Sequence, residues 1–288
     1  MGHVSRCIGL IHQLREQGNE LIVACSDEQR AVFSIYFNDL TFVNHAPYPF
    51  KFGGKGWFSF DLLKQYGPLK RRRKQELKEV EKLVKEYSID VVISDHRYGF
   101  RSNDAYSVVV THQLNLPILW FEAPIQRIHK RLLKKFDRVW VMDFADSRLA
   151  GKLSRNTSLH SADYIGPYSR FQMYSLSREK KGHHVLIASG PKVYAQKLVD
   201  EICASKKEAP IEIVASEEID VSSGNQVQGW RAQDEVILSA SSLTSRSGYS
   251  TIMDLHFLQT PAELIATPGQ REQIYLAELH KEKQTFNK

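Results

Sequence analysis

A short stretch near the C-terminal end combines residue types that suit the binding of a phosphate group. Ser247 and Gly248 follow the apolar segment 236–243, and apolar residues then recur at helical spacing at positions 252, 255 and 258. A strand that turns into a helix at Ser-Gly presents backbone N–H groups at the positive end of the helix dipole, where anions bind. We predict Ser247 as the N-cap and a diphosphate as the anion. An ordinary capped helix is the alternative interpretation.

The same helix carries a polar stripe. Positions 247, 250, 251 and 254 fall on one helical face, so Ser250, Thr251 and Asp254 extend away from the predicted phosphate position. A carboxylate two turns into the helix is suited to accept hydrogen bonds from a ribose. A solvated polar face is the alternative.

A second motif, Thr267–Ala277 (TPGQREQIYLA), follows the apolar strand predicted at 262–266. With Ser245–Leu255 (SRSGYSTIMDL), it resembles the donor half of GT-B nucleotide-sugar glycosyltransferases of family 28, which include the peptidoglycan GlcNAc transferase. The likeness is greatest to a bacterial group that carries both motifs in this order. It implies an α/β fold of two Rossmann-like domains facing across a cleft, and a UDP-sugar donor, above all UDP-GlcNAc.

The resemblance also implies donor-site roles. Asp254 stands where the peptidoglycan enzyme has a ribose-binding glutamate, and Trp230 is either a stacking surface for uracil or a core or interface tryptophan. The amides of Gln270 and Gln273 suit sugar hydroxyls. The nucleotide-sugar-binding residues that we expect are Ser189, Gly190, Trp230, Arg246, Ser247, Gly248, Tyr249, Ser250, Thr251, Asp254, Gly269, Gln270 and Gln273.

Sugar transfer also needs a proton acceptor for the hydroxyl that is glycosylated. His3 is our candidate base, because the Gly-His-x-x-Arg stretch of GT-B enzymes forms a loop that faces the cleft and imidazole titrates near neutrality. Asp95, at the end of another predicted strand, is suited to orient that imidazole. The alternatives are a histidine that shapes the loop and an aspartate that caps a helix. The chain shows no Asp-x-Asp motif, so we expect no metal and no cofactor.

Strands alternate with helical segments, which favours parallel sheets. We predict an acceptor-side domain over 1–168, a linker over 169–183 and a nucleotide-sugar-binding domain over 184–288. Compared with GT-B enzymes, the chain is apparently truncated at the first strand and at the C-terminus. Residues 47–60, rich in Gly and aromatics, are predicted to form either a self-packed loop or an acceptor-binding lid.

Composition and charge limit the classes of molecule that this protein is expected to bind. With 288 residues and 42% hydrophobic content, the chain is large enough for two cores. Its net charge is +6, with basic runs at 70–74 and 127–135, yet it shows no nucleic-acid-binding motif. The three cysteines lack metal or disulfide spacing, which favours the cytoplasm. We therefore expect a cytoplasmic protein whose basic helices either contact the membrane peripherally or are simply solvated.

These observations predict a hexosyltransferase that moves a sugar from a UDP-sugar to a cell-envelope or lipid-linked acceptor. Two alternatives remain. Gly-His-Val-x-Arg-Cys (2–7) also resembles the phosphate loop of a UDP-sugar hydrolase of nonulosonate synthesis, so a hydrolase or epimerase on the same fold is one. An inactive truncated remnant is the other.

Overall fold

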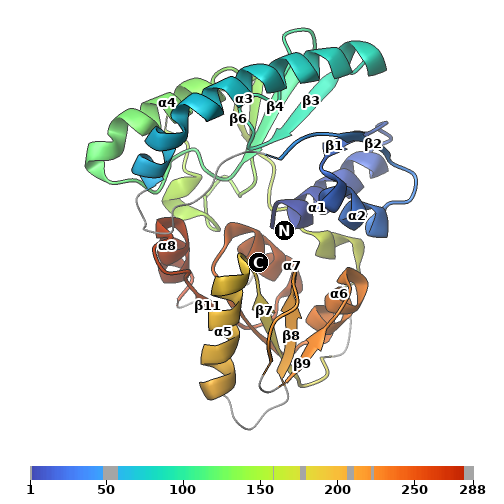
Figure 1. Ribbon diagram of the computed structural model, residues 1–288, viewed down its shortest axis with the longest axis vertical. Coiled ribbons are helices and arrows are strands. Elements are labelled where there is room, and N and C mark those ends of the chain that lie inside the picture. The colour runs from blue at the N-terminus through green and yellow to red at the C-terminus, as the bar shows by residue number, and fades with distance from the viewer. Residues whose placement is uncertain are drawn as a thin grey trace. The chain divides into compact units, whose positions relative to one another are not determined.

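The computed structural model describes residues 2–47, 58–157, 159–175, 180–205, 211–221 and 224–281. The chain divides into two compact units, Met1–Ala46 with Tyr168–Lys288, and Pro47–Pro167 (Figure 1). The predicted division placed residues 1–168 in one domain. The structure instead groups the first 46 residues with the C-terminal half of the chain.

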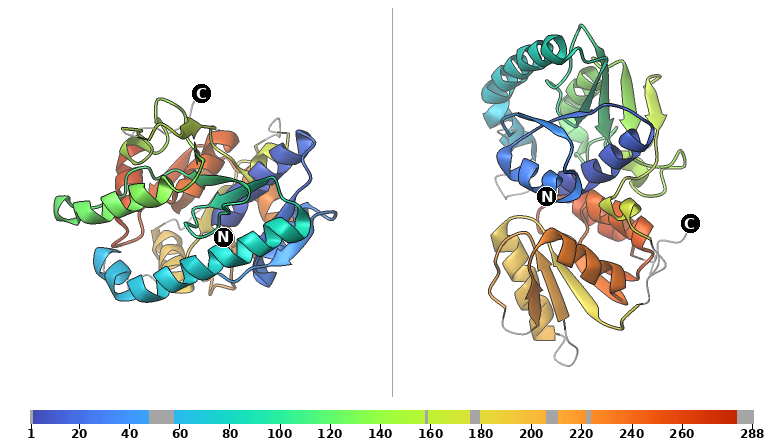
Figure 2. Two further views of the ribbon diagram at one scale, coloured as in Figure 1. Left: turned by 90° about the horizontal axis from the view of Figure 1, so that it is seen from above. Right: turned by 90° about the vertical axis from the view of Figure 1, so that its right-hand side faces the viewer.

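The unit Pro47–Pro167 is built on a four-stranded parallel sheet in the order β3-β4-β5-β6. The strands are β3 (Val91–Asp95), β4 (Tyr106–Thr111), β5 (Arg138–Val141) and β6 (Ala162–Tyr164), and the helices are α3 (Phe58–Tyr87), α4 (Ala123–Leu133), and the short 3₁₀ turns η1 (Trp120–Glu122) and η2 (Gly151–Leu153). Figure 2 shows the long α3 running beside this sheet.

Helices α3 and α4 cover the same face of that sheet. From α3, Val80 and Val84 pack against Val92 of β3, and from α4, Leu133 packs against Val109 of β4. Val92 pairs with the residue two positions before Val109, and side chains two apart on a strand share a face. The β3–β4 edge is therefore held in place by both helices.

The other unit contains a five-stranded parallel sheet in the order β11-β10-β7-β8-β9. Its elements are β7 (His184–Ala188), α5 (Lys192–Ser205), β8 (Ile211–Ala215), β9 (Asn225–Val227), α6 (Trp230–Ser239), β10 (Ser242–Arg246), α7 (Tyr249–Leu258), β11 (Ala262–Ile265) and α8 (Arg271–Leu279). Leu198 and Val199 of α5, both fully buried, pack over β7 and β8 to form its core.

The first residues of the chain add a small α/β layer to this unit. Its elements are α1 (Gly2–Glu16), β1 (Ile22–Cys25), α2 (Asp27–Tyr36) and β2 (Thr41–Asn44), and β1 pairs with β2 in parallel. A capping box between Ser26 and Gln29 begins α2. Val4 and Ile8 of α1 and Phe33 of α2 form its buried cluster, against which Trp230 of α6 packs.

Close packing of α1 explains why residues 1–46 belong to this unit. Helix α1 lies against α7 and against the 3₁₀ helix η3 (Arg170–Met173). A Cβ at Gly9 would come within 2.5 Å of both the Ser169 carbonyl oxygen and Gln172 Oε1, so α1 approaches this segment as closely as its backbone allows. The predicted linker 169–183 is therefore not a plain linker at its start, because residues 169–171 are buried.

Two further elements differ from the expectations. The segment predicted to be apolar before β10 includes the end of helix α6, and β6 was not predicted. Helix α3 contains Pro68. Most of the aromatic segment 47–60 falls outside the described residues. Among the helices of the described residues, none combines the length and the apolar character that a bilayer crossing requires.

Candidate functional site

The candidate site lies where three neighbouring parallel strands end. In the sheet order β11-β10-β7, each strand is followed by a helix: β7 by α5, β10 by α7 and β11 by α8. The carboxyl ends of parallel strands meet at one sheet edge, which is where α/β proteins bind ligands. Both motifs singled out in the sequence lie at this edge, one after β10 and the other after β11.

Gln273 joins the two motifs. Its backbone carbonyl oxygen accepts a hydrogen bond of 2.8 Å from Ser247 Oγ, and its Oε1 accepts one of 2.8 Å from the Thr267 N–H. Its Nε2 donates to Gln270 Oε1 at 2.7 Å. Thr267, Gln270 and Gln273 thus form one hydrogen-bonded loop that holds the start of α8 against Ser247.

The start of α7 differs from the prediction in one respect. Gly248, not Ser247, is the N-cap, in extended conformation (φ −70°, ψ 146°), and no side chain caps this helix. Ser247 is fully buried and its hydroxyl is used by Gln273. Around Gly248 there is room for a larger group, because an added Cβ would have its nearest neighbour, Gln273 Nε2, 4.0 Å away. The first turn of α7 therefore offers backbone N–H groups to an anion.

Gly190 and Gly269 occupy positions that favour glycine. Both have left-handed backbone angles, φ +99° for Gly190 and φ +80° for Gly269, which residues with a Cβ rarely adopt. Gly190 follows Ser189 in the turn between β7 and α5, and a Cβ at Gly190 would meet no atom within 4 Å. Gly269 precedes Gln270, the N-cap of α8. The turn at Gly190 therefore leaves space at the sheet edge.

Arg246, one of the predicted nucleotide-sugar-binding residues, makes hydrogen bonds to backbone carbonyl groups of its own unit. Its Nη1 donates to the Ala266 carbonyl at 3.2 Å and its Nη2 to the Tyr194 carbonyl at 3.0 Å. The side chain is buried, and burial lowers the pKa of its guanidinium. These two hydrogen bonds connect the end of β10 to α5 and to the residue that follows β11.

The other α7 residues divide by burial. Tyr249 is buried in the core, 3% exposed, so its ring is part of the packing. Ser250 and Thr251 are half-buried in the first turn of the helix. Their predicted contact with a nucleotide sugar stays a prediction.

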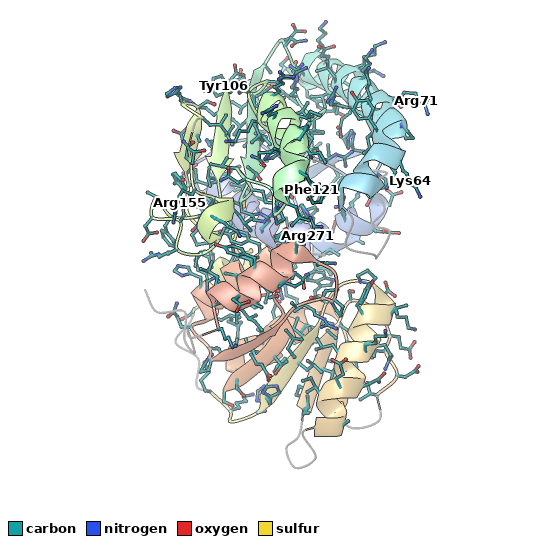
Figure 3. The ribbon with its side chains drawn as sticks, turned by 90° about the vertical axis from the view of Figure 1, so that its left-hand side faces the viewer. Lys64, Arg71, Tyr106, Phe121, Arg155 and Arg271 are labelled. Atoms are coloured by element: carbon teal, nitrogen blue, oxygen red, sulfur yellow. The ribbon has the colours of Figure 1, made fainter. Side chains whose placement is uncertain are left out.

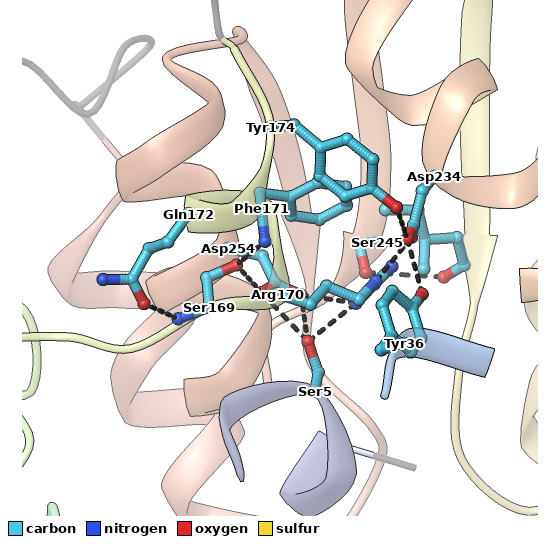
Figure 4. Close-up of polar contacts among 11 residues, drawn as sticks. Ser5, Tyr36, Ser169, Arg170, Phe171, Gln172, Tyr174, Asp234, Ser245 and Asp254 are labelled. Atoms are coloured by element: carbon cyan, nitrogen blue, oxygen red, sulfur yellow. Dashed lines mark hydrogen bonds and ion pairs between the residues drawn. The ribbon is translucent and has the colours of Figure 1, made fainter. Parts of the chain in front are cut away.

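Asp254 lies in a polar network that the sequence did not reveal (Figure 4). Its Oδ1 accepts hydrogen bonds from Ser169 Oγ at 2.5 Å and Ser5 Oγ at 3.2 Å, and its Oδ2 lies 3.3 Å from Arg170 Nη1. Burial raises the pKa of this carboxyl, and Arg170, Ser169 and Ser5 oppose that rise. Both oxygens are engaged by the protein, so a ribose would have to displace a partner.

Arg170 is the centre of this network. Its Nε donates to Asp234 Oδ1 at 2.5 Å, and its Nη1 donates to Ser5 Oγ at 2.7 Å. Burial disfavours the charge of Arg170, but Asp254 and Asp234 outweigh this effect and raise its pKa. Asp234 also accepts the hydroxyls of Tyr36 and Tyr174, at 2.5 and 2.8 Å. The sequence signal for this anchor was Ser169-x-x-Gln172, a capping box that was not recognised.

Trp230 is half-buried and packs against neighbouring side chains, and its predicted stacking on uracil stays a prediction. Its indole meets the Tyr36 ring edge-on at 6.4 Å, and the Arg170 guanidinium lies 5.4 Å from the indole centroid. These contacts make Trp230 part of the packing between α6 and the N-terminal layer.

The two predicted catalytic residues belong to different units. His3 lies in the first turn of α1 and is exposed, and its Nδ1 accepts a 2.7 Å hydrogen bond from Arg6 Nη2. Guanidinium groups only donate, so a neutral His3 carries its proton on Nε2 and acts outward as a donor. Asp95 is the last residue of β3 and is half-buried. Their pairing stays a prediction.

Searching the described residues found no group of three or more His, Cys, Asp and Glu side chains placed to hold a metal ion.

The chain resembles known proteins in its structure and not in its sequence. No protein-family model matches the sequence, and no curated protein matches it significantly. Solved structures do match. The spinosyn rhamnosyltransferase SpnG has a TM-score of 0.62 at 15% identity and covers 97% of this chain and 81% of its own. The glycosyltransferase SnogD from Streptomyces nogalater has a TM-score of 0.57 at 11% identity, covering 99% and 93%.

MurG of Acinetobacter baumannii has a TM-score of 0.50 at 13% identity and covers 96% of this chain and 79% of its own. At such identities the likeness concerns the fold. The chain therefore has the GT-B fold of these glycosyltransferases, made of α/β units on parallel sheets.

Proposed function

We propose that this protein transfers a hexosyl group from a UDP-sugar to an acceptor hydroxyl, with UDP-GlcNAc as the first donor to test. The junction of Ser247 and Gln273 carries the proposal. It brings both donor motifs to the carboxyl edge of adjacent strands, beside the uncapped start of α7. Structures of two proteins with similar folds, SpnG and SsfS6, are described as complexes with thymidine diphosphate.

In this proposal the diphosphate of the donor lies at the start of α7. Backbone N–H groups and the helix dipole there stabilise the negative charge that develops as the nucleoside diphosphate leaves. Gly248, Gly190 and Gly269 let the phosphates and the sugar approach the backbone, and the Gln270 amide binds sugar hydroxyls. The proposal requires no metal ion, so transfer should persist in excess EDTA.

We propose further that the acceptor is linked to a lipid or to the cell envelope, and that α4 contacts the cytoplasmic face of the membrane. Leu119 and Phe121, just before α4, and Ile128 on it are exposed apolar side chains, between 43 and 54% accessible. Phe121 is labelled in Figure 3. Arg127 and Arg131 lie on the same helix. Apolar side chains flanked by basic ones favour an anionic lipid surface.

Calorimetry with UDP and with TDP, followed by incubation with radiolabelled UDP-GlcNAc, tests the proposal. We expect UDP to bind and label to appear in a lipid-extractable product when lipid-linked acceptors are added. Release of free sugar at the same rate with and without acceptor would identify a hydrolase instead. Preference for TDP would revise the donor, and lack of binding to either nucleotide would remove the proposal.

Vesicle sedimentation tests the membrane contact. The double variant F121S/I128S should lose most of its binding to vesicles that contain anionic lipid. V193S is the matched control, because Val193 is exposed on α5 and is 66% accessible. Equal binding of all three proteins would contradict the role of α4.

A further inference from the structure

Arg246 is a buried cation at the carboxyl edge of the five-stranded sheet. It is the last residue of β10, and its side chain is nearly inaccessible, with 4% of the residue exposed. Its two hydrogen bonds reach Tyr194 in the first turn of α5 and Ala266, the residue that follows β11. Because α5 follows β7, the guanidinium spans the sheet edge between the two strands that flank β10.

No ion pair neutralises Arg246 within the residues that the structure describes. Its two acceptors are carbonyl oxygens, which satisfy N–H groups but carry no net charge. Burial lowers the pKa of the guanidinium, and the carboxylate that opposes this shift belongs to Glu201, an exposed residue of α5. Because arginine keeps its proton in proteins, the edge of the sheet contains a buried positive charge.

The Nε–H group of Arg246 is a buried donor for which the described residues provide no acceptor. An unpaired buried donor is unfavourable, so such a group in a folded protein calls for an explanation, of which a bound ion is one. This observation concerns a side chain, and it is therefore independent of the backbone geometry at the start of α7. Both features point to an anion at the same sheet edge.

The helices that begin at this edge add to its positive charge. Neither α5 nor α7 has an acidic residue in its first turn, where acidic residues commonly offset the helix dipole. The first turn of α8 has one, Glu272, which directly follows the basic Arg271. The starts of α5 and α7 and the buried Arg246 therefore give the edge an excess of positive charge.

We propose that Arg246 stabilises, through its electric field, the negative charge that the diphosphate of the donor gains during sugar transfer. The inference rests on the proposed transferase function. In that reaction the bond from the anomeric carbon to the diphosphate oxygen breaks, and its electron pair stays on that oxygen. The acceptor oxygen forms the new bond to the anomeric carbon, and its proton passes to water. The diphosphate thus leaves with one more negative charge than it carried in the donor.

A buried and fixed cation is well suited to this task. Away from water the attraction between opposite charges is stronger, and salt screens it less than it screens charges on the surface. Because carbonyl groups hold both terminal nitrogens, the guanidinium of Arg246 does not have to reorient as the charge develops. Arg246 should therefore favour the transition state and the released nucleoside diphosphate over the bound nucleotide sugar.

Calorimetry with UDP and with uridine separates an effect of charge from a structural one. Arg246→Gln and Arg246→Lys both lose the fork of N–H groups, but only the glutamine variant loses the charge. Arg246→Gln should lower the UDP affinity by about tenfold and change the uridine affinity by less than about twofold, because uridine carries no phosphate. Arg246→Lys should keep its UDP affinity within about threefold of the wild type.

Lys197→Met is the matched control, since it removes an exposed positive charge from α5, and it should change neither affinity. Urea unfolding shows which variants are folded, and Arg246→Met replaces Arg246→Gln in the comparison if the latter is not. Equal losses of UDP and uridine affinity in the uncharged variant would overturn the inference. Equal UDP affinities of the uncharged and the lysine variants would do the same.

Kinetics test the stabilisation of the leaving group. With UDP-GlcNAc and a lipid-linked acceptor, Arg246→Gln should lower kcat by about 10- to 10²-fold with a smaller change in KM, because the extra charge develops only after the substrate has bound. Arg246→Lys should recover most of the lost kcat. If the wild type transfers sugar and Arg246→Gln matches it in kcat, this inference alone is overturned. If the wild type binds no nucleotide and transfers nothing, the proposed function falls, and the role of Arg246 falls with it.

Discussion

Arg170 and Asp234 form a buried ion pair in which Nε and Oδ1 are 2.5 Å apart. The pair connects η3 to α6, and the Tyr36 hydroxyl on Asp234 adds helix α2. Three stretches that are far apart in the sequence thereby meet at one carboxylate. This contact, with the Asp254 network beside it, holds the first 46 residues on the C-terminal sheet.

Arg170→Met should lower the free energy of unfolding by about 3–5 kcal/mol, because it leaves two buried carboxylates without their cation. Urea unfolding followed by tryptophan fluorescence measures the loss. Arg15→Met is the control, since the Arg15–Asp39 pair is 35 and 60% exposed and should contribute less than about 1 kcal/mol. Similar losses in both variants would show that Arg170 is not an anchor.

Gly9→Ala should also destabilise the protein, by about 1–3 kcal/mol, although alanine favours helices. The added methyl group would overlap the Ser169 carbonyl and force α1 away from η3. Gly67→Ala is a matched control in α3, where a Cβ meets no atom within 4 Å, and should stabilise slightly. If Gly9→Ala raised the thermal midpoint as Gly67→Ala does, the close approach would be disproved.

Asp254→Asn separates a structural from a ribose-binding role. Because both oxygens of Asp254 are engaged by Ser5, Ser169 and Arg170, we expect a loss of stability and a UDP affinity within twofold of the wild type. Calorimetry measures the UDP affinity, and urea unfolding of the same preparation measures the free energy of unfolding. A loss of roughly 1.5–3 kcal/mol in UDP binding with unchanged stability would instead restore the ribose contact.

Gly248→Ala reports directly on the donor site. The backbone angles of Gly248 suit alanine, and the nearest protein atom to the new methyl group would be 4.0 Å away, so stability should stay within about 0.5 kcal/mol. If a diphosphate contacts the backbone here, UDP affinity should fall at least tenfold. Unchanged affinity in a stable variant would place the phosphates elsewhere.

His129 gives the unit Pro47–Pro167 a characteristic pH dependence. Its pKa falls from 6.5 to about 4 on folding, so the unfolded chain binds more protons between these values. The free energy of unfolding should therefore be highest above pH 6.5, and it should fall by about 3 kcal/mol as the pH approaches 4. Hydrogen exchange of the β4 amides measures it locally. His129→Gln should flatten this slope and the exposed His160→Gln should not.

Much of the architecture followed from the sequence. Apolar segments such as 91–93 and 213–215 are typical of buried parallel strands, because burial on both faces leaves few polar positions, and both segments lie in strands of the structure. The Ser-Gly turn before α7 and the Thr-Pro-Gly-Gln turn before α8 were also recognised, since glycine at such turns has a local backbone cause.

Partners that are distant in the sequence were decided by the tertiary structure. Arg170 lay in a predicted linker, and its value as an anchor depends on Asp234 and Asp254, which no local pattern connects to it. Ser247 was expected to cap α7, but Gln273, on another helix, competes for its hydroxyl. Local sequence determines backbone conformation, whereas the competition among partners for a hydrogen bond is settled only when the chain is packed.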